Sequence, residues 1–289
     1  MFKVLVTGAK GQVGSELIKL APAGFTVIGL DSAQLDITDQ EQVNAAVALH
    51  QPDLIINAAA YTAVDKAESD SDNAYAVNEQ AVAWLAQAAV QADIPFFHIS
   101  TDYVFDGEST TPYKETDPVN PQSVYGASKL AGEQVLAATH NKHIILRTSW
   151  VFGAEGNNFV KTMLRLGKER DELSVVADQY GCPTSAASIA DVLWQLAEMY
   201  KQKNSLPWGI YHFSNSPACT WYDFAVEIFK QAKEKDLIDK VPKVNAITTA
   251  EYPTPAKRPV WSVLDCGNIK YLTTNAVVFW EKELNSLMV

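Results

Sequence analysis

Cysteine is scarce in this sequence and poorly placed for disulfide bonds or metal binding. The three cysteines, Cys182, Cys219 and Cys266, are odd in number and far apart, and no C-x-x-C pair occurs in the 289 residues. Small disulfide-stapled domains and zinc knuckles both need such pairs, so both classes are excluded. We expect packed or half-buried thiols in a reducing compartment.

Long hydrophobic runs are also missing. No uninterrupted apolar stretch reaches the roughly 18 residues that a membrane-spanning helix needs. The N-terminus, MFKVLVTG, has one early charge, a short apolar run and a glycine turn, which is typical of a first β-strand rather than a signal peptide. We therefore expect a cytoplasmic protein with no membrane partner.

Positive charge is in deficit. Lys and Arg number 23 against 34 Asp and Glu, and the formal net charge is −11. A nucleic-acid-binding surface needs clustered basic residues, so we expect no nucleic-acid partner. An anionic small ligand is still compatible, because a few Lys, Arg and backbone N–H groups suffice to bind phosphate. Hydrophobic residues make up 47% and charged residues 20%, which is the composition of a globular protein.

Apolar runs and helical patterns alternate through the first half of the chain. Continuous apolar strands separated by helices are typical of a parallel sheet covered on both faces, so we predict an α/β fold with a doubly wound parallel sheet. The expected strands are Phe2–Thr7, Thr26–Leu30, Leu54–Ala58, Phe96–Ser100 and Ile144–Thr148. The expected helices are Gln12–Leu20, Asp39–His50, Asp72–Ala92 and Val124–Ala138.

A glycine loop follows the first strand and opens the first helix. Its glycines are Gly8, Gly11 and Gly14. The first allows a tight turn, the second lets the backbone approach a pyrophosphate, and the third allows close contact between helix and sheet. Free N–H groups and the helix dipole favour phosphates at this helix N-terminus. In this strand–loop–helix context, the loop predicts a dinucleotide-binding domain of the Rossmann type.

The residue after the second strand bears on the choice of cofactor. Asp31 lies 17 residues after Gly14, where a carboxylate accepts hydrogen bonds from the adenosine ribose 2′-OH and favours NADH. The alternative is that Asp31 only caps a turn. Lys10 could instead pair with a 2′-phosphate, so the sequence leaves both NADH and NADPH open. Asp36 and Ile37 are expected to flank the adenine.

The pattern changes after about Trp150, where Gly, Pro and aromatic residues become frequent. Helical patterns recur at Asn158–Gly167, Ile189–Tyr200 and Trp221–Asp236, and polar Gln202–Leu206 is expected to be a surface loop. We predict a dinucleotide-binding domain over 1–150, with parts of 168–204 returning to it. Residues 151–289 are expected to form mainly a smaller α/β substrate lobe.

A tyrosine and a lysine lie four residues apart on a predicted helix, and therefore on one face of it. These residues are Tyr125 and Lys129. Reduction of a ketone needs a proton donor at the carbonyl oxygen, and a nearby ammonium lowers the pKa of a phenol toward the working pH. Thr101, at the end of the strand before, could hydrogen-bond the same oxygen. This group predicts a carbonyl reductase.

Together these motifs resemble the dTDP-4-dehydrorhamnose reductase family of the extended short-chain dehydrogenase/reductase superfamily. The resemblance covers nearly the whole chain. The matching strings are Thr7–Gly14 (TGAKGQVG), Asn57–Glu68 (NAAAYTAVDKAE), Ser100–Gly107 (STDYVFDG), Val124–Glu133 (VYGASKLAGE), Arg147–Gly153 (RTSWVFG), Asn158–Met163 (NFVKTM), Asp178–Thr184 (DQYGCPT) and Arg258-Pro259 with Ser262. The family implies NAD(P)H-dependent reduction of the 4-keto group of a dTDP-linked sugar, in the synthesis of dTDP-L-rhamnose for cell-surface polysaccharide.

The resemblance also implies roles for individual residues. The catalytic residues would be Thr101, Tyr125 and Lys129, with Lys129 also holding the nicotinamide ribose. The cofactor-binding residues would be Gly8, Lys10, Gly11, Gln12, Val13, Gly14, Asp31, Asp36, Ile37, Ala58, Ala59, Ala60, Thr62, Tyr125 and Lys129. The substrate-binding residues would be Asp102, Tyr103 and Trp150 for the sugar, with Asn158 and Arg258 for the nucleotide diphosphate.

The sequence departs from one feature of the family. Some of its members are dimers bridged by a metal ion that several glutamates hold. Glu16 lies where one such glutamate would be, but Pro183–Asp191 contains none, and His140 and His143 read as ordinary surface histidines. We therefore expect no structural or catalytic metal, and either a monomer or a homodimer.

Two other functions share this fold. One is a non-catalytic regulatory subunit like the β subunit of methionine adenosyltransferase, which binds a dinucleotide without reducing a sugar. Another is an epimerase or dehydratase of the same superfamily, which often carries a glutamate or other base beside the S/T-D pair. The intact catalytic group and the succession Thr101-Asp102-Tyr103 favour a reductase.

Overall fold

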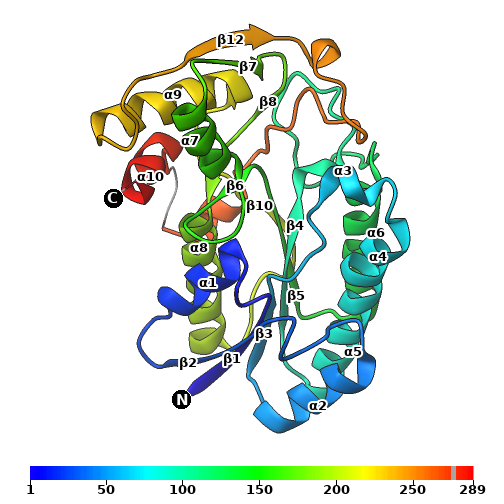
Figure 1. The fold of residues 1–289 in the computed structure, drawn as a ribbon. Coiled ribbons are helices and arrows are strands. Elements are labelled where there is room, and N and C mark those ends of the chain that lie inside the picture. Colours follow the sequence, from blue (N-terminus) through cyan, green and yellow to red (C-terminus); the bar gives the residue numbers. More distant parts are fainter. Residues whose placement is uncertain (275–277, 289) are drawn as a thin grey trace.

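A six-stranded parallel sheet forms the centre of the molecule, in a computed structural model that describes residues 1–274 and 278–288 (Figure 1). The strand order is β10-β5-β4-β3-β1-β2, and every neighbouring pair is parallel. The strands are β1 (Phe2–Thr7), β2 (Phe25–Leu30), β3 (Leu54–Asn57), β4 (Phe96–Thr101), β5 (His143–Thr148) and β10 (Gly209–His212). The predicted doubly wound sheet is confirmed.

Helices cover both faces of this sheet (Figure 1). One face carries α1 (Gln12–Lys19) and α8 (Ala186–Lys203), and the other carries α2 (Gln40–His50), α5 (Ala81–Ala92) and α6 (Val124–Thr139). Successive residues of β1 point to opposite faces, so Val4 and Val6 belong to one hydrophobic core and Leu5 belongs to the other. Burial on both faces explains why the strands are continuously apolar.

The helix predicted at Asp72–Ala92 is helical throughout but not uniform. It consists of α4 (Ser71–Tyr75), a π-helical turn η1 (Ala76–Gln80) and α5. The π turn brings the backbone of Asn78 against α6, where a Cβ on Gly132 would lie 2.0 Å from the Asn78 carbonyl oxygen. Asn78 also donates from Nδ2 to Ser128 at 3.0 Å. A tertiary contact therefore decides this irregularity.

The surface loop predicted at Gln202–Leu206 is wrong in part. Helix α8 begins at Ala186, after the N-cap Ser185, and continues to Lys203, so Gln202 and Lys203 are helical. Leu206 is buried in the core under the sheet. With α8 and β10, the chain returns to the sheet after the second lobe has begun.

A second, smaller lobe lies beyond the carboxyl ends of the central strands (Figure 1). Two parallel strands, β7 (Glu172–Val176) and β12 (Lys243–Ile247), pair there, and α7 (Phe159–Glu169), α9 (Trp221–Glu234) and α10 (Trp280–Leu287) share a separate hydrophobic core. The remaining elements are α3 (Val64–Ala67), η2 (Asp102–Val104), β6 (Val151–Phe152), β8 (Tyr180–Gly181), β9 (Thr184–Ser185), β11 (Cys219–Thr220), η3 (Thr249–Glu251) and η4 (Ile269–Tyr271). No helix in 1–274 or 278–288 is long and apolar enough to cross a bilayer.

Candidate active site

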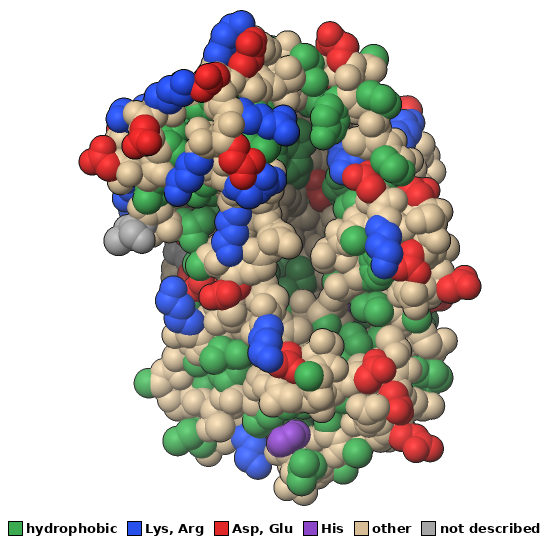
Figure 2. Space-filling model, viewed as in Figure 1, with side chains coloured by type: hydrophobic (Ala, Val, Ile, Leu, Met, Phe, Trp, Pro, Cys, Tyr) green, Lys and Arg blue, Asp and Glu red, His purple; other side chains and the backbone are tan. Residues whose placement is uncertain are grey.

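Two cavities lie on the side of the sheet where the strands end, and a deep hollow opens between the two lobes (Figure 2). The smaller, of about 460 Å³, lies at the ends of β1, β2 and β3. The larger, of about 720 Å³, lies in the second lobe between α7, β7 and the segment 252–258. Because the strand order reverses between β1 and β3, the smaller cavity occupies the position where α/β sheets bind dinucleotides.

Most residues predicted to bind the dinucleotide meet at the smaller cavity. Those that line it are Gly8, Lys10, Gly11, Asp31, Asp36, Ile37, Ala58, Ala59 and Ala60. Gln12, Val13 and Gly14 lie in the first turn of α1 beside it. Thr62 is exposed and does not line the cavity.

The backbone of the glycine loop tolerates no side chain at two positions. Gly8 has φ +69°, and a Cβ there would lie 2.6 Å from the amide nitrogen of Ala59. A Cβ on Gly14 would lie 2.1 Å from the carbonyl oxygen of Gly8. The N-cap of α1 is Gly11, which brings no side chain to the N–H groups of the first turn. Such a bare helix N-terminus fits the pyrophosphate of a dinucleotide.

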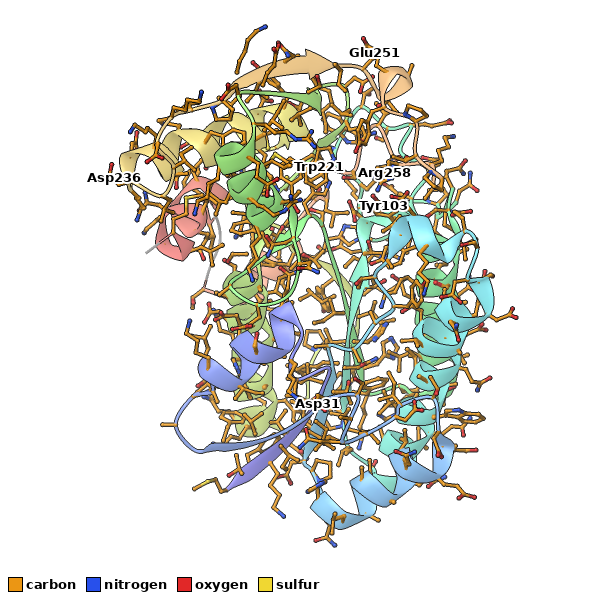
Figure 3. The ribbon with its side chains drawn as sticks, viewed as in Figure 1. Asp31, Tyr103, Trp221, Asp236, Glu251 and Arg258 are labelled. Carbon is orange, nitrogen blue, oxygen red and sulfur yellow. The ribbon has the colours of Figure 1, made fainter. Side chains whose placement is uncertain are left out.

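Asp31 and Lys10 form an ion pair at the rim of the smaller cavity. The hydrogen bond from Lys10 lowers the pKa of Asp31, and so does the bond from the amide of Ala33. Asp31 Oδ1 accepts from Ala33 N at 2.8 Å and from Gln34 N at 3.2 Å, so the carboxylate also caps a turn. Figure 3 places Asp31 in the sheet half of the molecule, away from the second lobe.

Thr101 and Tyr125 lie together at the end of β4. Their hydroxyl groups are near enough for Thr101 to influence the pKa of Tyr125, and Thr101 Oγ1 donates to Asp102 Oδ1 at 2.9 Å. The ring of Tyr125 packs edge-on against Tyr103, with centroids 5.4 Å apart. Burial raises the pKa of Tyr125 to about 12, against the lowering effect of the nearby Thr101 hydroxyl. Tyr125 is therefore protonated at neutral pH.

Lys129 is buried, and its amino group lies against β4. Its Nζ donates to the carbonyl of Ile99 at 2.7 Å and lies 3.2 Å from Nε2 of His98. Burial lowers the pKa of Lys129 to about 8. We expected the lysine to lower the pKa of Tyr125, but that pKa is raised, because burial of the phenol outweighs every other influence on it.

Asp102 lies behind Thr101 and is 2% exposed. Burial raises its pKa to about 6, although Thr101, which donates to Oδ1, and the nearby Ser262 oppose the rise. The neighbouring Tyr103 is half-buried, and burial raises its pKa as well. The ring of Tyr103 thus contacts that of Tyr125, whereas the buried carboxylate of Asp102 accepts a hydrogen bond from Thr101.

Arg258 is the one predicted substrate residue that lines the larger cavity. Its guanidinium forks onto Asp65, with NH1–Oδ1 and NH2–Oδ2 both at 2.9 Å. Figure 3 shows Arg258, Tyr103 and Trp221 grouped around the cleft. Trp221, Arg170, Gln179 and Tyr252 also line this cavity, and no role was predicted for any of them. They come from separate elements, and of the four only Gln179 lies in a matching string, Asp178–Thr184.

Trp150 and Asn158 make contacts within the protein. Trp150 has φ +47° and its indole packs against Gly181, where a Cβ would lie 2.4 Å from the ring. Asn158 caps α7, accepting from Lys161 N at 3.0 Å, and its Nδ2 donates to Gln12 Oε1 at 2.9 Å. It thereby ties the second lobe to α1. Neither residue lines the larger cavity, and their contact with substrate stays a prediction.

No group of three or more potential metal ligands occurs among residues 1–274 and 278–288. Glu16 is 7% exposed, and its carboxylate lies 3.6 Å from Lys19 Nζ. The expectation that His140 is a surface histidine is wrong: it is buried, with Nε2 2.8 Å from the carbonyl of Ile94. All three cysteines are free thiols, buried or half-buried as expected.

Comparisons with known proteins agree across the whole chain. The family model described as the RmlD substrate binding domain matches residues 2–289. A relative from Aggregatibacter actinomycetemcomitans, dTDP-4-dehydrorhamnose reductase, is 48% identical over 99% of this chain and 98% of its own. The crystal structure of a dTDP-4-dehydrorhamnose reductase from Clostridium acetobutylicum has a TM-score of 0.90 at 45% identity and covers 99% of this chain and 98% of its own. That of Bacillus anthracis, in complex with NADP, has a TM-score of 0.88 at 39% identity and covers 99% of both chains.

Proposed function

This chain belongs to the dTDP-4-dehydrorhamnose reductase family, and from that premise we propose that it reduces the 4-keto group of dTDP-4-dehydro-L-rhamnose to dTDP-L-rhamnose with NADPH or NADH. The observation that carries the proposal is the meeting of two features at one edge of the sheet. The glycine loop fits a dinucleotide pyrophosphate, and Tyr125 with Thr101 lies at the end of β4.

Tyr125 is the proton donor in this proposal. A reduced nicotinamide supplies the hydride that adds to the carbonyl carbon of the sugar. The carbonyl oxygen must gain a proton at the same time, and the raised pKa keeps Tyr125 protonated at neutral pH. Thr101 lies beside the phenol, where it can reach the oxygen that Tyr125 protonates.

Lys129 would hold the nicotinamide ribose and, when charged, stabilise the phenolate that remains on Tyr125 after proton transfer. In the cofactor cavity the glycine loop would hold the pyrophosphate, and Asp31 or Lys10 would meet the adenosine ribose. The larger cavity would take the nucleotide, with Arg258 near its phosphates and Trp221 against an apolar face.

One assay separates this proposal from its alternatives. The protein is incubated with dTDP-4-dehydro-6-deoxysugar and NADPH or NADH, and cofactor oxidation is followed by absorbance. A reductase oxidises one cofactor for each sugar reduced. A regulatory subunit would bind the cofactor, measurable by its fluorescence, without oxidising it. An epimerase or dehydratase would change the sugar without net oxidation, which product analysis by NMR would reveal.

A further inference from the structure

A line of four buried polar side chains crosses the sheet from β1 to α6. Thr7 Oγ1 donates to Asn57 Oδ1 at 2.6 Å, and Asn57 Nδ2 lies 3.1 Å from His98 Nδ1. On the other side of the ring, His98 Nε2 lies 3.2 Å from Lys129 Nζ. None of the four residues is more than 2% exposed. Polar groups this deeply buried must form hydrogen bonds with one another, so which atom donates and which accepts is tightly constrained.

The amide of Asn57 can adopt only one orientation. Its Oδ1 accepts from the backbone N–H of Ala59 at 3.1 Å, as well as from Thr7. A backbone N–H can only donate, so the oxygen must be on that side and Nδ2 must face His98. Asn57 therefore donates to His98 Nδ1, and this ring nitrogen carries no proton.

The ring proton of His98 consequently lies on Nε2. Burial lowers the pKa of His98 well below its usual value, and the neighbouring Lys129 lowers it further, so the imidazole is neutral. A neutral imidazole has one N–H, and Nδ1 is already an acceptor. The proton on Nε2 points at the amino nitrogen of Lys129.

An ammonium can only donate hydrogen bonds, whereas a neutral amine can also accept one. With a donor on His98, the contact is favourable only for the amine. We propose that His98 is a positioning residue of this reductase site, which holds the amino group of Lys129 against the carbonyl of Ile99 and favours its uncharged form. The burial that lowers the pKa of Lys129 to about 8 acts in the same direction.

The other charged groups near Lys129 also affect its protonation state. Glu133, four residues further along α6, favours the ammonium, but its carboxylate accepts from Arg147 of β5 at 2.7 Å and from Ser100 of β4 at 2.5 Å. Tyr125 on α6 and Asp102 after β4 are the titratable groups at the neighbouring end of the site. Burial places the pKa of Lys129 at about 8, within the working pH range, and in this proposal the N–H of His98 opposes the charged form as well.

The proposal deepens the proposed function and rests on it for its catalytic meaning. If charged Lys129 stabilises the phenolate of Tyr125, activity should decline as pH rises through the pKa of the lysine. Through its effect on Lys129, His98 would then help to determine the pH at which activity declines on the alkaline limb of the profile. A purely structural histidine would affect folding or overall rate without moving that limb.

The ring proton is tested directly, without substrate or cofactor. Nitrogen-15 NMR of the histidine-labelled protein should show His98 with a protonated Nε2 and a bare Nδ1 from about pH 6 to about pH 8. His98→Gln identifies the resonance by its loss. A proton on Nδ1, or a charged ring in that range, overturns the proposal. Since this readout needs no turnover, failure of the proposed reaction would be distinguishable from failure of the inference.

Two variants then test the effect on Lys129. Asn57→Asp keeps the acceptor for Thr7 and Ala59 but replaces the donor that faces His98, so the ring proton moves to Nδ1 and Nε2 can accept from an ammonium. His98→Gln can turn its carbonyl oxygen to Lys129. Both should move the alkaline limb of kcat/KM upward by about one pH unit.

His212→Gln is the matched control. His212 is equally buried, but its nitrogens lie against Arg147 at 3.4 Å and the carbonyl of Tyr113 at 3.0 Å. It should leave the limb in place. If both test variants also leave it in place, His98 does not govern the charge of Lys129 and the proposal fails. Should Asn57→Asp not fold, His98→Gln and the NMR measurement still decide.

Discussion

The indoles of Trp150 and Trp221 lie face to face, with ring centroids 3.5 Å apart and planes 6° apart. Trp150 comes shortly after β5 of the central sheet, whereas Trp221 is the first residue of α9 in the second lobe. Trp221 lines the larger cavity and Trp150 does not. The stack therefore joins the two lobes at the cleft and holds Trp221 beside the proposed nucleotide site.

Trp221→Ala should weaken binding of the nucleotide sugar, because it removes an aromatic wall of the cavity. We expect KM for the sugar to rise about tenfold and the affinity for the dinucleotide to stay unchanged. Steady-state kinetics and cofactor fluorescence titration measure the two effects. Trp84→Ala, on α5 and remote from the cavity, is the control and should leave KM for the sugar unaltered.

Tyr125→Phe should reduce kcat by about 10²- to 10⁴-fold, because the phenol is the proposed proton donor. Cofactor affinity should remain near that of the wild type, since the ring itself is kept. Steady-state assays measure kcat, and fluorescence titration measures the affinity for the cofactor. A kcat close to the wild-type value would remove Tyr125 from the mechanism.

Asp31→Ala and Lys10→Ala should change cofactor preference in opposite directions. Loss of the carboxylate removes a ribose partner and a repulsive charge, so kcat/KM for NADPH relative to NADH should rise about tenfold. Loss of the lysine removes a phosphate partner, so the same ratio should fall. The two ratios are measured in parallel. If neither variant changes its ratio, Asp31 acts only as a turn cap.

Asp102 should make the protein less stable as pH rises. Its pKa is about 6 in the folded protein, above the roughly 3.9 of an unfolded chain, so the folded state holds its proton longer. Stability is therefore lost as pH increases from about 4 to about 6, by an amount on the order of 2–3 kcal/mol. Asp102→Asn should remove this dependence. Urea unfolding at a series of pH values measures it, and parallel curves for both proteins would contradict the assignment.

Removal of metal ions should alter neither activity nor molecular mass. A hard cation takes about six oxygen ligands, and Glu16, which lies near Lys19, cannot supply such a site alone. Light scattering and the reductase assay, each with and without EDTA, test this expectation. Dissociation of an assembly or loss of turnover on adding EDTA would reveal a metal site formed by other carboxylates.

Local patterns were enough to predict five of the six strands of the sheet and the glycine loop after β1, but not β10. A parallel strand buried on both faces must be continuously apolar, so β1, β3 and β4 are visible in the sequence. The positive φ of Gly8 and the close backbone approach at Gly14 leave no room for a side chain at either position. The fold of this loop therefore requires the glycines by which the motif is recognised in the sequence. The four-residue spacing of Tyr125 and Lys129 places both on one face of a helix, wherever that helix packs.

The partners of those side chains depended on tertiary structure. Lys129 meets His98 because α6 packs on β4, and no spacing in the sequence predicts that contact. Arg258 reaches Asp65 across 193 residues, and Trp221 meets Trp150 only where the two lobes adjoin. Burial, which raises the pKa of Tyr125 to about 12, likewise exists only in the packed protein. Backbone periodicity is a local property of the chain, whereas side-chain contacts and desolvation arise when distant segments exclude water together.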